Sequence, residues 1–420
     1  MVEAADGRRA GVRPGEHSPA PLRAMTEPVP RNRRATVADR DVRLLAFYLP
    51  QFHPVPENDD WWGEGFTEWT NVVTARPLFR GHYQPHLPAD LGFYDLRLPE
   101  TRAAQAELAA AHKIDGFVYY HYWFHGRRVL DRPFREVLES GEPKMPFALC
   151  WANENWTRAW DGGSRQVLIE QTYSPADDAQ HIRELLPAFA DERYIRVQGK
   201  PLFLVYRASR LPDPRRTTEQ WRREADRAGI GDLYLCKIDG FSEDVGTPPD
   251  SLGFDAAVAW IPDATRLGRP LRWARPWGLM RRLGVSPKVW GSNLIHQYER
   301  AVDCALERPE DAYRVHPCVV PGWDNSARRR GGGAHILVNA TPGRYGAWLT
   351  ESLRRESGRP IPRLVFVNAW NEWAEGNHLE PDQRWGRTYL QATRDAVDAA
   401  RSEFAPPIDR SSTSLSIGGS

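Results

Sequence analysis

Eight short apolar runs recur along the chain, and most of them are followed by a segment with helical periodicity. The runs are continuous and do not alternate with polar residues, which is typical of parallel strands covered on both faces. Eight successive strand–helix units predict an α/β fold, a single (β/α)8 TIM barrel. No GxGxxG motif follows the first run, which disfavours a Rossmann-type sheet. The runs cover residues 43–52, 115–124, 146–155, 201–207, 232–240, 254–260, 316–325 and 363–372.

The ends of the chain have a different character from its centre. Residues 1–40 are rich in Arg, Pro and Ala without periodicity, and we expect them to be disordered, with Met25 as an alternative start. The tail 405–420 is equally featureless, which leaves 41–404 as the catalytic barrel. Long loops are expected at 53–97, after the first strand, and at 261–293, after the sixth. Loops of this length are usually functional.

Composition excludes several classes of protein. The net charge of +1 disfavours a nucleic-acid partner. No apolar run of about 18 residues exists, so no transmembrane segment is expected, and no signal-peptide core follows the N-terminal arginines. Four distant cysteines without a CxxC pair fit a reduced, cytoplasmic protein. The 17 tryptophans often lie beside Asn, Glu and His, which suits the faces and hydroxyls of sugars.

Polar and aromatic residues follow five of the eight runs directly. Active sites of such barrels lie at the carboxyl ends of the strands. We therefore expect one rim to carry these side chains, although any single cluster could merely cap its strand. The residues are Gln51, His53, His121, Tyr122, Trp123, Asn153, Glu154, Asn155, Trp156, Trp323, Asp324, Asn325, Asn371, Glu372 and Glu375.

The stretch NAWNEWAEGNHLEP, residues 368–381, sets Glu372 and Glu375 three positions apart. If the chain turns helically there, their Cβ atoms lie about 5–6 Å apart. Retaining glycosidases hold their two carboxyls about 5–5.5 Å apart, and inverting ones hold them further apart. Trp370 and Trp373 would shield the pair and raise the pKa of one glutamate, as a general acid requires. The alternative is that both glutamates face solvent or pair with arginines.

Other motifs are weaker. The histidines lack HExxH or a comparable ligand spacing, so no metal and no cofactor is predicted. The arginines of RRRGGG, residues 328–333, suit either a phosphate group or an exposed loop. No GxSxG elbow supports serine hydrolase chemistry. The histidines considered are His53, His82, His86, His121 and His125.

Seven long motifs spanning residues 45 to about 390 resemble those of one family. They are FYLPQFHP, WWGEGFTEWTNV, GHYQPHLPADLGFYDL, GFVYYHYWFHGRRVL, CWANENWTRAWDG, PGWDNSARR and NAWNEWAEGNHLEP. The chain resembles the WbsX-like proteins of bacterial surface-polysaccharide clusters, which are related to glycoside hydrolase family 99. The resemblance implies a barrel in which Glu372 deprotonates the sugar 2-hydroxyl, which attacks its own anomeric carbon to give an anhydro-sugar. Glu375 would then protonate the leaving oxygen and later activate water.

Three functions remain open at this point. The leading hypothesis is a retaining glycoside hydrolase or transglycosylase that acts on a bacterial oligosaccharide or polysaccharide in cell-surface polysaccharide metabolism. The alternative is a sugar-nucleotide-dependent glycosyltransferase of lipopolysaccharide, O-antigen or other polysaccharide biosynthesis, although the one Asp-x-Asp, residues 39–41, precedes the first strand. A non-catalytic glycan-binding barrel is the third. Besides catalytic Glu372 and Glu375, the expected substrate contacts are His53, Trp62, Glu68, His121, Tyr122, Trp123, Asn153, Glu154, Trp156, Trp323, Asp324, Asn325, Trp370, Asn371 and Trp373.

Overall fold

The computed structural model describes most of the chain between residues 41 and 403. The described ranges are 41–158, 163–263, 267–271, 283, 292–309, 311–329 and 331–403. The segments predicted to be disordered, 1–40 and 405–420, lie outside these residues, and so does much of the loop predicted at 261–293.

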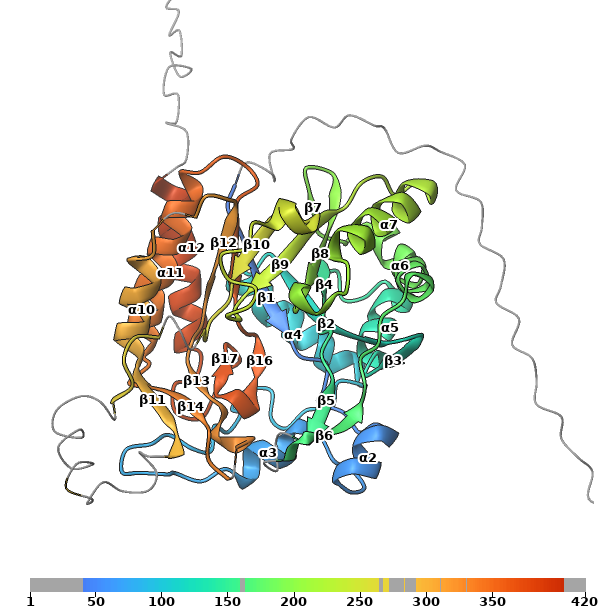
Figure 1. Cartoon of the computed structure of the whole chain (residues 1–420). Coiled ribbons are helices and arrows are strands. Elements are labelled where there is room, and N and C mark those ends of the chain that lie inside the picture. Colours follow the sequence, from blue (N-terminus) through green and yellow to red (C-terminus); the bar gives the residue numbers. More distant parts are fainter. Residues whose placement is uncertain are drawn as a thin grey trace, which may run out of the picture. The chain divides into compact units, whose positions relative to one another are not determined.

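Eight parallel strands close into a barrel, as the sequence predicted (Figure 1). Each strand pairs in parallel with the next along the chain, and the last pairs with the first, Leu45 lying opposite Phe366. Each of the eight predicted runs overlaps one strand. The strands are β1 (Arg43–Tyr48), β2 (Gly116–Phe124), β4 (Phe147–Trp151), β8 (Lys200–Val205), β9 (Tyr234–Asp239), β10 (Ala256–Ala259), β12 (Val315–Val319) and β15 (Leu364–Val367).

The barrel strands are mostly apolar because both of their faces are covered, and the charged Lys237 and Asp239 of β9 pair with each other. Every residue of β2, β4, β9 and β15 is buried. One face of each strand fills the barrel interior and the other packs under the surrounding helices. Aromatic rings fill part of the interior, such as Phe47, whose ring centroid lies 4.8 Å from that of Trp260.

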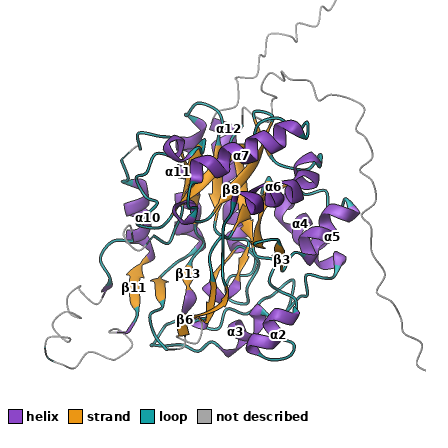
Figure 2. Cartoon of the chain, turned by 45° about the vertical axis from the view of Figure 1, so that its right-hand side comes forward, coloured by secondary structure: helices purple, strands orange, loops and turns teal. Residues whose placement is uncertain are grey.

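Helices cover the outside of the barrel (Figure 2). Three of them begin with a side-chain cap followed by proline, in which Ser174, Asp213 and Thr341 each accept a hydrogen bond from a backbone N–H of the first turn. Between β9 and β10 a single 3-10 turn, η3 (Pro249–Leu252), replaces the helix. The helices are α4 (Pro99–Ala111), α5 (Arg132–Ser140), α6 (Pro175–Ala190), α7 (Pro214–Arg227), α10 (Tyr298–Leu306), α11 (Pro342–Ser357) and α12 (Thr388–Glu403).

Short elements gather at the end of the barrel where the strands finish (Figures 1 and 2). The long loop after β1 forms two small helices, α2 (Pro56–Trp62) and α3 (Glu68–Thr74). The sequence of residues 292–307 has helical periodicity and predicts a helix, but the segment begins with a strand, β11 (Leu294–Gln297), because these residues pair with β14 (His335–Val338). β13 (Trp323–Asp324) completes that sheet, and β5 (Trp156–Arg158) pairs with β6 (Gly163–Ile169).

Along the described part of the chain, no helix has both the length and the apolar character that crossing a bilayer requires.

Candidate active site

A short hairpin after β15 carries the two glutamates. β16 (Asn371–Glu372) pairs antiparallel with β17 (Asn377–His378), and one 3-10 turn, η6 (Trp373–Glu375), joins them. Gly376 ends this turn in the left-handed region, with φ 56°, and packs so closely that an added Cβ would lie 3.1 Å from the Cβ of Asp324. The turn brings Glu375 back toward Glu372.

The side chain of Asn371 fixes this hairpin to the end of the first strand. Its Oδ1 accepts a hydrogen bond of 2.7 Å from the Leu49 backbone N–H, and its Nδ2 donates one of 3.0 Å to the Leu49 carbonyl. Both bonds are buried, where paired polar groups hold position best. The hairpin therefore has a defined place at the carboxyl ends of the barrel strands.

A cavity of about 260 Å³ opens beside the hairpin, with Glu372 and Glu375 in its wall. Aromatic rings form much of the remaining wall, and they come from β2, from α2 and from the segments after β4, β8 and β10. The other lining residues are Leu49, Gln51, Asn58, Trp61, Trp62, Tyr120, Tyr122, Ala152, Glu154, Asn155, Trp156, Thr157, Leu168, Tyr206, Trp260 and Arg328.

Arg328 contacts three carboxylates at the floor of this cavity. Its Nη1 lies 2.7 Å from Glu375 Oε1, and its Nη2 lies 3.0 Å from Glu372 Oε2. Nε and Nη2 both donate to Glu68 Oε2, at 3.1 and 3.0 Å. The guanidinium is a planar fork. Glu68 lies along the edge formed by Nε and Nη2, and the two hairpin glutamates lie at the end formed by Nη1 and Nη2. Both glutamates therefore pair with an arginine, which was one of the alternatives considered for them, and they are also buried.

Burial raises the pKa of both hairpin glutamates. For Glu372 the pKa rises from 4.5 to about 8, because burial and the neighbouring carboxylates Glu375 and Glu68 outweigh the opposing effect of Arg328. Burial likewise raises the pKa of Glu375, with Glu68 adding to the effect and Arg328 opposing it. One cation among three carboxylates leaves excess negative charge, so the pair retains a proton near neutral pH, shared between coupled sites.

Several residues predicted to contact substrate lie at this cavity. Trp62, Tyr122, Glu154 and Trp156 line it. Gln51 orients Tyr122 by donating a hydrogen bond of 2.8 Å to the phenolic oxygen. The predicted contact Glu68 is 1% exposed and reaches the site through Arg328.

Other lining residues were not predicted. Tyr120 lies two positions before Tyr122 in β2, and the period of two in a strand directs both into the cavity. Tyr206 and Trp260 follow β8 and β10, so the rule that strand ends carry the site would also have found them. Nothing in the residues around Arg328 indicated that it has three distant acidic partners.

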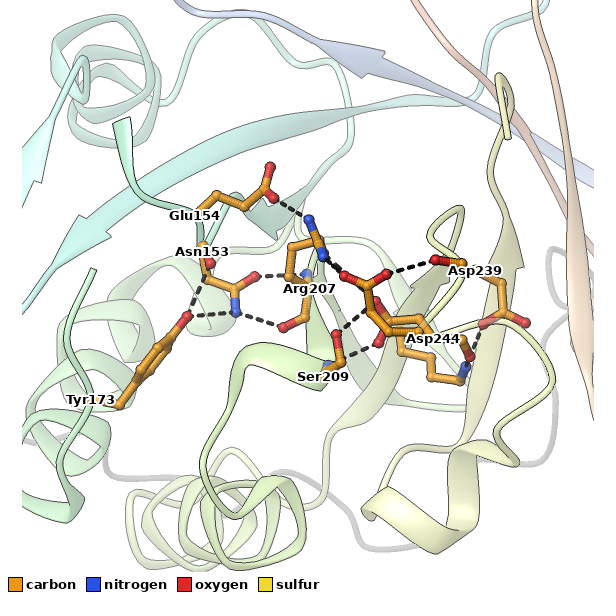
Figure 3. A network of polar contacts seen from close by, with 10 residues as sticks. Asn153, Glu154, Tyr173, Arg207, Ser209, Asp239 and Asp244 are labelled. Carbon is orange, nitrogen blue, oxygen red and sulfur yellow. Dashed lines mark hydrogen bonds and ion pairs between the residues drawn. The ribbon is translucent and has the colours of Figure 1, made fainter. Parts of the chain in front are cut away.

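Asn153 supports the site from behind, in a network of polar contacts (Figure 3). Its Nδ2 donates to the Arg207 carbonyl at 2.9 Å, and its Oδ1 accepts from the Arg207 N–H at 2.8 Å. The Arg207 guanidinium forms ion pairs with Glu154 and Glu243 and lies 3.9 Å above the Phe241 ring. Asn153 does not line the cavity. It holds the residue that positions the cavity's Glu154.

Three predicted contacts from the first two strands lie away from the cavity. His121 Nε2 lies 3.0 Å from His181 Nε2, and Trp123 donates to Asp177, because alternate residues of β2 point outward. His53 is 1% exposed, and burial lowers its pKa to about 4.

The hairpin residues Trp370, Asn371 and Trp373 are also interior. Trp370 is fully buried. Trp373 Nε1 donates a hydrogen bond of 2.6 Å to Glu380, and its ring stacks on His378 with centroids 3.8 Å apart. None of the three lines the cavity, so the rings that shield the two glutamates come from other segments of the chain.

A second cavity, of about 470 Å³, takes in Trp323 and Asp324. Asp324 Oδ2 lies 2.6 Å from His82 Nε2 and accepts a hydrogen bond of 2.8 Å from Gln84. Asn325 accepts one from the His335 backbone. These three predicted contacts therefore belong to a different part of the surface from the Glu372–Glu375 cavity.

Comparison with known proteins identifies the family. A family model described as glycosyltransferase WbsX matches residues 44–393. The chain belongs to the WbsX family. Two curated relatives, both uncharacterized proteins named WxcX from strains of Xanthomonas campestris pv. campestris, are 44% and 43% identical over 359 residues. These 359 residues are 85% of this chain and 50% of each relative, so the chain spans about half their length.

Solved structures share the fold of this WbsX-family chain. A glycoside hydrolase-like protein superposes with a TM-score of 0.53 at 15% identity, covering 89% of this chain and 97% of that one. A GH99 endo-alpha-mannosidase from Bacteroides thetaiotaomicron superposes with a TM-score of 0.52 at 14% identity, covering 86% and 98%. The family description and these barrels all concern carbohydrate-active enzymes.

Proposed function

We propose that this WbsX-family chain is a retaining glycoside hydrolase or transglycosylase in which Glu372 and Glu375 act on a bacterial glycan. The observation that supports this most is the meeting of both glutamates with Arg328 in the wall of one aromatic-lined cavity. Two carboxyl groups in such a cavity are the chemical requirement for glycoside cleavage.

The protonation of the pair supports acid–base work. Glycoside cleavage needs one protonated carboxyl to donate to the leaving oxygen and one carboxylate to act on the sugar. The raised pKa values let the pair hold one proton near neutral pH. With the roles implied by the family resemblance, Glu375 donates that proton and Glu372 takes the proton of the sugar 2-hydroxyl.

Burial raises the pKa of both carboxyls, so the proton is shared between Glu372 and Glu375. The roles proposed here require that the shared proton is on Glu375 when the substrate binds, with Arg328 in contact with both carboxyls. The reverse assignment, with Glu372 as the acid, is separated from this one by the leaving-group experiment in the Discussion.

The position of Arg328 supports the retaining outcome. Because Glu68 occupies one edge of the guanidinium, Glu372 and Glu375 share its end. This favours the separation of about 5–5.5 Å that retaining enzymes use over the wider gap that admits a water between the carboxyls.

The rings around the pair suit a sugar. Trp62, Trp156 and Trp260 offer apolar faces, while Tyr122 and Glu154 offer groups that bond hydroxyls. A pyranose presents both kinds of surface, so this wall would orient it over the two glutamates.

A second candidate is a sugar-nucleotide-dependent glycosyltransferase, which the family description favours. Such an enzyme needs a group that neutralises the diphosphate of its donor. Among the described residues that line the cavity, Arg328 is the one lysine or arginine, and it is already bound to three carboxylates, which supports the hydrolase or transglycosylase.

A ligand screen with the purified full chain separates these functions. Oligosaccharides are compared with nucleotide sugars for their effect on Tm. They include alpha-mannosides because a GH99 endo-alpha-mannosidase shares this fold. We expect an oligosaccharide to raise Tm and to be cleaved or transferred, and we expect Glu375→Gln to slow that turnover by about 10²–10⁴-fold. Glu107→Gln, an exposed change on α4, serves as the control. A Tm rise with nucleotide sugars alone, with transfer from them, would overturn the proposal.

A further inference from the structure

The second cavity contains a cluster of side chains that the proposed reaction does not use. His82, His86, Asp324, His378 and Asp382 all line it, and it takes in Gly376 and His378 of the glutamate hairpin but neither glutamate. His82 and Asp324 pair with each other at 2.6 Å. The remaining three, His86, His378 and Asp382, converge on one another.

Donor atoms of these three residues approach a common point. One ligand atom from each of His86, His378 and Asp382 lies within 4.8 Å of those of the other two. His86 Nδ1 and His378 Nε2 are 2.9 Å apart. Among the described residues, this is the one group of three or more His, Cys, Asp or Glu side chains with such convergence.

The orientation of His378 is that of a metal ligand. Its Nδ1–H donates a hydrogen bond of 2.9 Å to the Glu380 carbonyl, so the lone pair is on Nε2, the atom that faces His86. Metal-bound histidines almost always donate their other ring N–H to a carbonyl or carboxylate in this way. The ring itself is fixed by stacking on Trp373.

Asp382 carries a charge that no nearby cation balances. It is 3% exposed. Its oxygens accept a hydrogen bond of 3.0 Å from the Tyr83 hydroxyl and one of 2.6 Å from the Trp385 backbone N–H. Within the described part of the chain, no lysine or arginine nitrogen lies within 4 Å of it, and Arg384 lies instead over the rings of Tyr83 and Trp385.

The nearby Glu380 provides a contrast. It is also buried, but it accepts hydrogen bonds from the side chains of Tyr94, Gln105 and Trp373. Among the described residues, Asp382 accepts a hydrogen bond from one side chain, that of Tyr83, so its remaining lone pairs are available to a ligand. Buried carboxylates are normally paired with a cation or coordinate a metal.

We propose that His86, His378 and Asp382 bind a divalent transition-metal ion of the zinc class, with water as the fourth ligand. Two imidazoles and one carboxylate are a ligand set that zinc accepts. Zinc bonds of about 2.0–2.2 Å put tetrahedral donors about 3.4 Å apart, so the two imidazoles must separate slightly and the carboxylate must approach. His86, the half-buried member on the long loop after β1, is the residue free to adjust.

The ion would connect two segments that are distant in sequence. His86 belongs to the loop after β1, whereas His378 belongs to β17, where the neighbouring Asn377 pairs with Glu372. The metal would therefore hold the hairpin to the loop after β1 from outside the catalytic cavity. Its expected role is structural, because none of its three ligands lines that cavity.

Cobalt spectroscopy tests the site independently of any enzymatic activity. The purified full chain is stripped with a chelator and titrated with Co²⁺, whose visible bands report coordination, and Zn²⁺ is then used to displace it. Tm is measured with and without Zn²⁺. We expect one ion per chain and a higher Tm with Zn²⁺.

Matched variants keep this test decisive. Asp382→Asn keeps the shape of the side chain, His86→Ala changes a half-buried loop residue, and His112→Ala removes a histidine at the end of α4 as the control. Asp382→Asn and His86→Ala should weaken Co²⁺ binding by more than the roughly 10–100-fold loss that follows removal of a residue that only supports a metal ligand. His112→Ala should bind Co²⁺ as the wild type does. Absence of Co²⁺ bands in the wild type, or unchanged bands in both Asp382→Asn and His86→Ala, would overturn the proposal.

Discussion

Replacing Glu372 by Gln should make the protein more stable while removing its activity. Folding buries this carboxyl beside Glu375 and Glu68, which raises its pKa from 4.5 to about 8. The unfolded chain releases the proton above pH 4.5, whereas the folded chain keeps it until about pH 8. The free energy of unfolding of the wild type therefore falls as pH rises from 4.5 to about 8. Glutamine does not ionise, so the variant avoids that loss.

The size of the gain follows from the pKa difference. Each pH unit above the unfolded value costs about 1.4 kcal/mol, so the variant should be roughly 3 kcal/mol more stable at pH 7. For a chain of this length the unfolding entropy is roughly 0.8 kcal/mol/K, which converts the gain into about 4 °C of Tm. At pH 4.5 the difference should nearly vanish, because the wild-type carboxyl is then protonated in the folded state.

Thermal unfolding of both proteins between pH 4.5 and pH 8 measures this difference directly. The exposed change Glu107→Gln is the control, and its Tm should follow the wild type within the roughly 0.5 kcal/mol expected of surface substitutions. The reasoning that this buried charge destabilises the fold would be refuted in either of two cases. The Tm gain of Glu372→Gln would not grow with pH, or the variant would have a lower Tm than the wild type at pH 7.

Three further predictions concern the reaction. Glu375→Gln should slow substrates with poor leaving groups by about 10²–10⁴-fold and spare activated aryl glycosides, whereas Glu372→Gln should slow both alike; equal losses on the two substrates for Glu375→Gln would contradict its role as the acid. kcat/KM should fall as pH rises through about 8, where the pair loses its proton. Arg328→Gln should move that fall to higher pH, because it removes the cation that lowers both pKa values. If the pH profile of Arg328→Gln matches that of the wild type, this charge does not act on the pair. EDTA at temperatures well below Tm should leave the rate unchanged, because the described residues with metal-ligand geometry lie outside the catalytic cavity; a loss reversed by Mn²⁺ or Mg²⁺ would favour a sugar-nucleotide transferase.

The barrel could be predicted from the sequence because burial on both faces makes each strand a continuous apolar run. The helices were mostly predictable as well, with prolines and caps at their first turns. The strand β11 was missed because its partner, β14, lies about 40 residues further along the chain. A pairing of that kind leaves no local pattern, and the helical periodicity of α10 extended the prediction backward over it.

The candidate site was only partly predictable for a similar reason. The search for polar residues at strand ends selected Glu372, Glu375, Tyr122 and Glu154, and all four line one cavity. The same rule selected Asn153, whose side chain instead bonds the backbone of Arg207. A strand end shows where a side chain starts, but its direction depends on contacts made by segments far away.

The bond between Asn371 and Leu49 joins residues 322 positions apart. A ribosome releases the first of these strands long before the second exists, and domains with such distant pairings fold slowly. The two glutamates reach their places only when β15 has docked against β1 and the ring is complete. Enzymatic activity would therefore appear only after the barrel has closed. A refolding chain should recover its secondary structure before it recovers any activity.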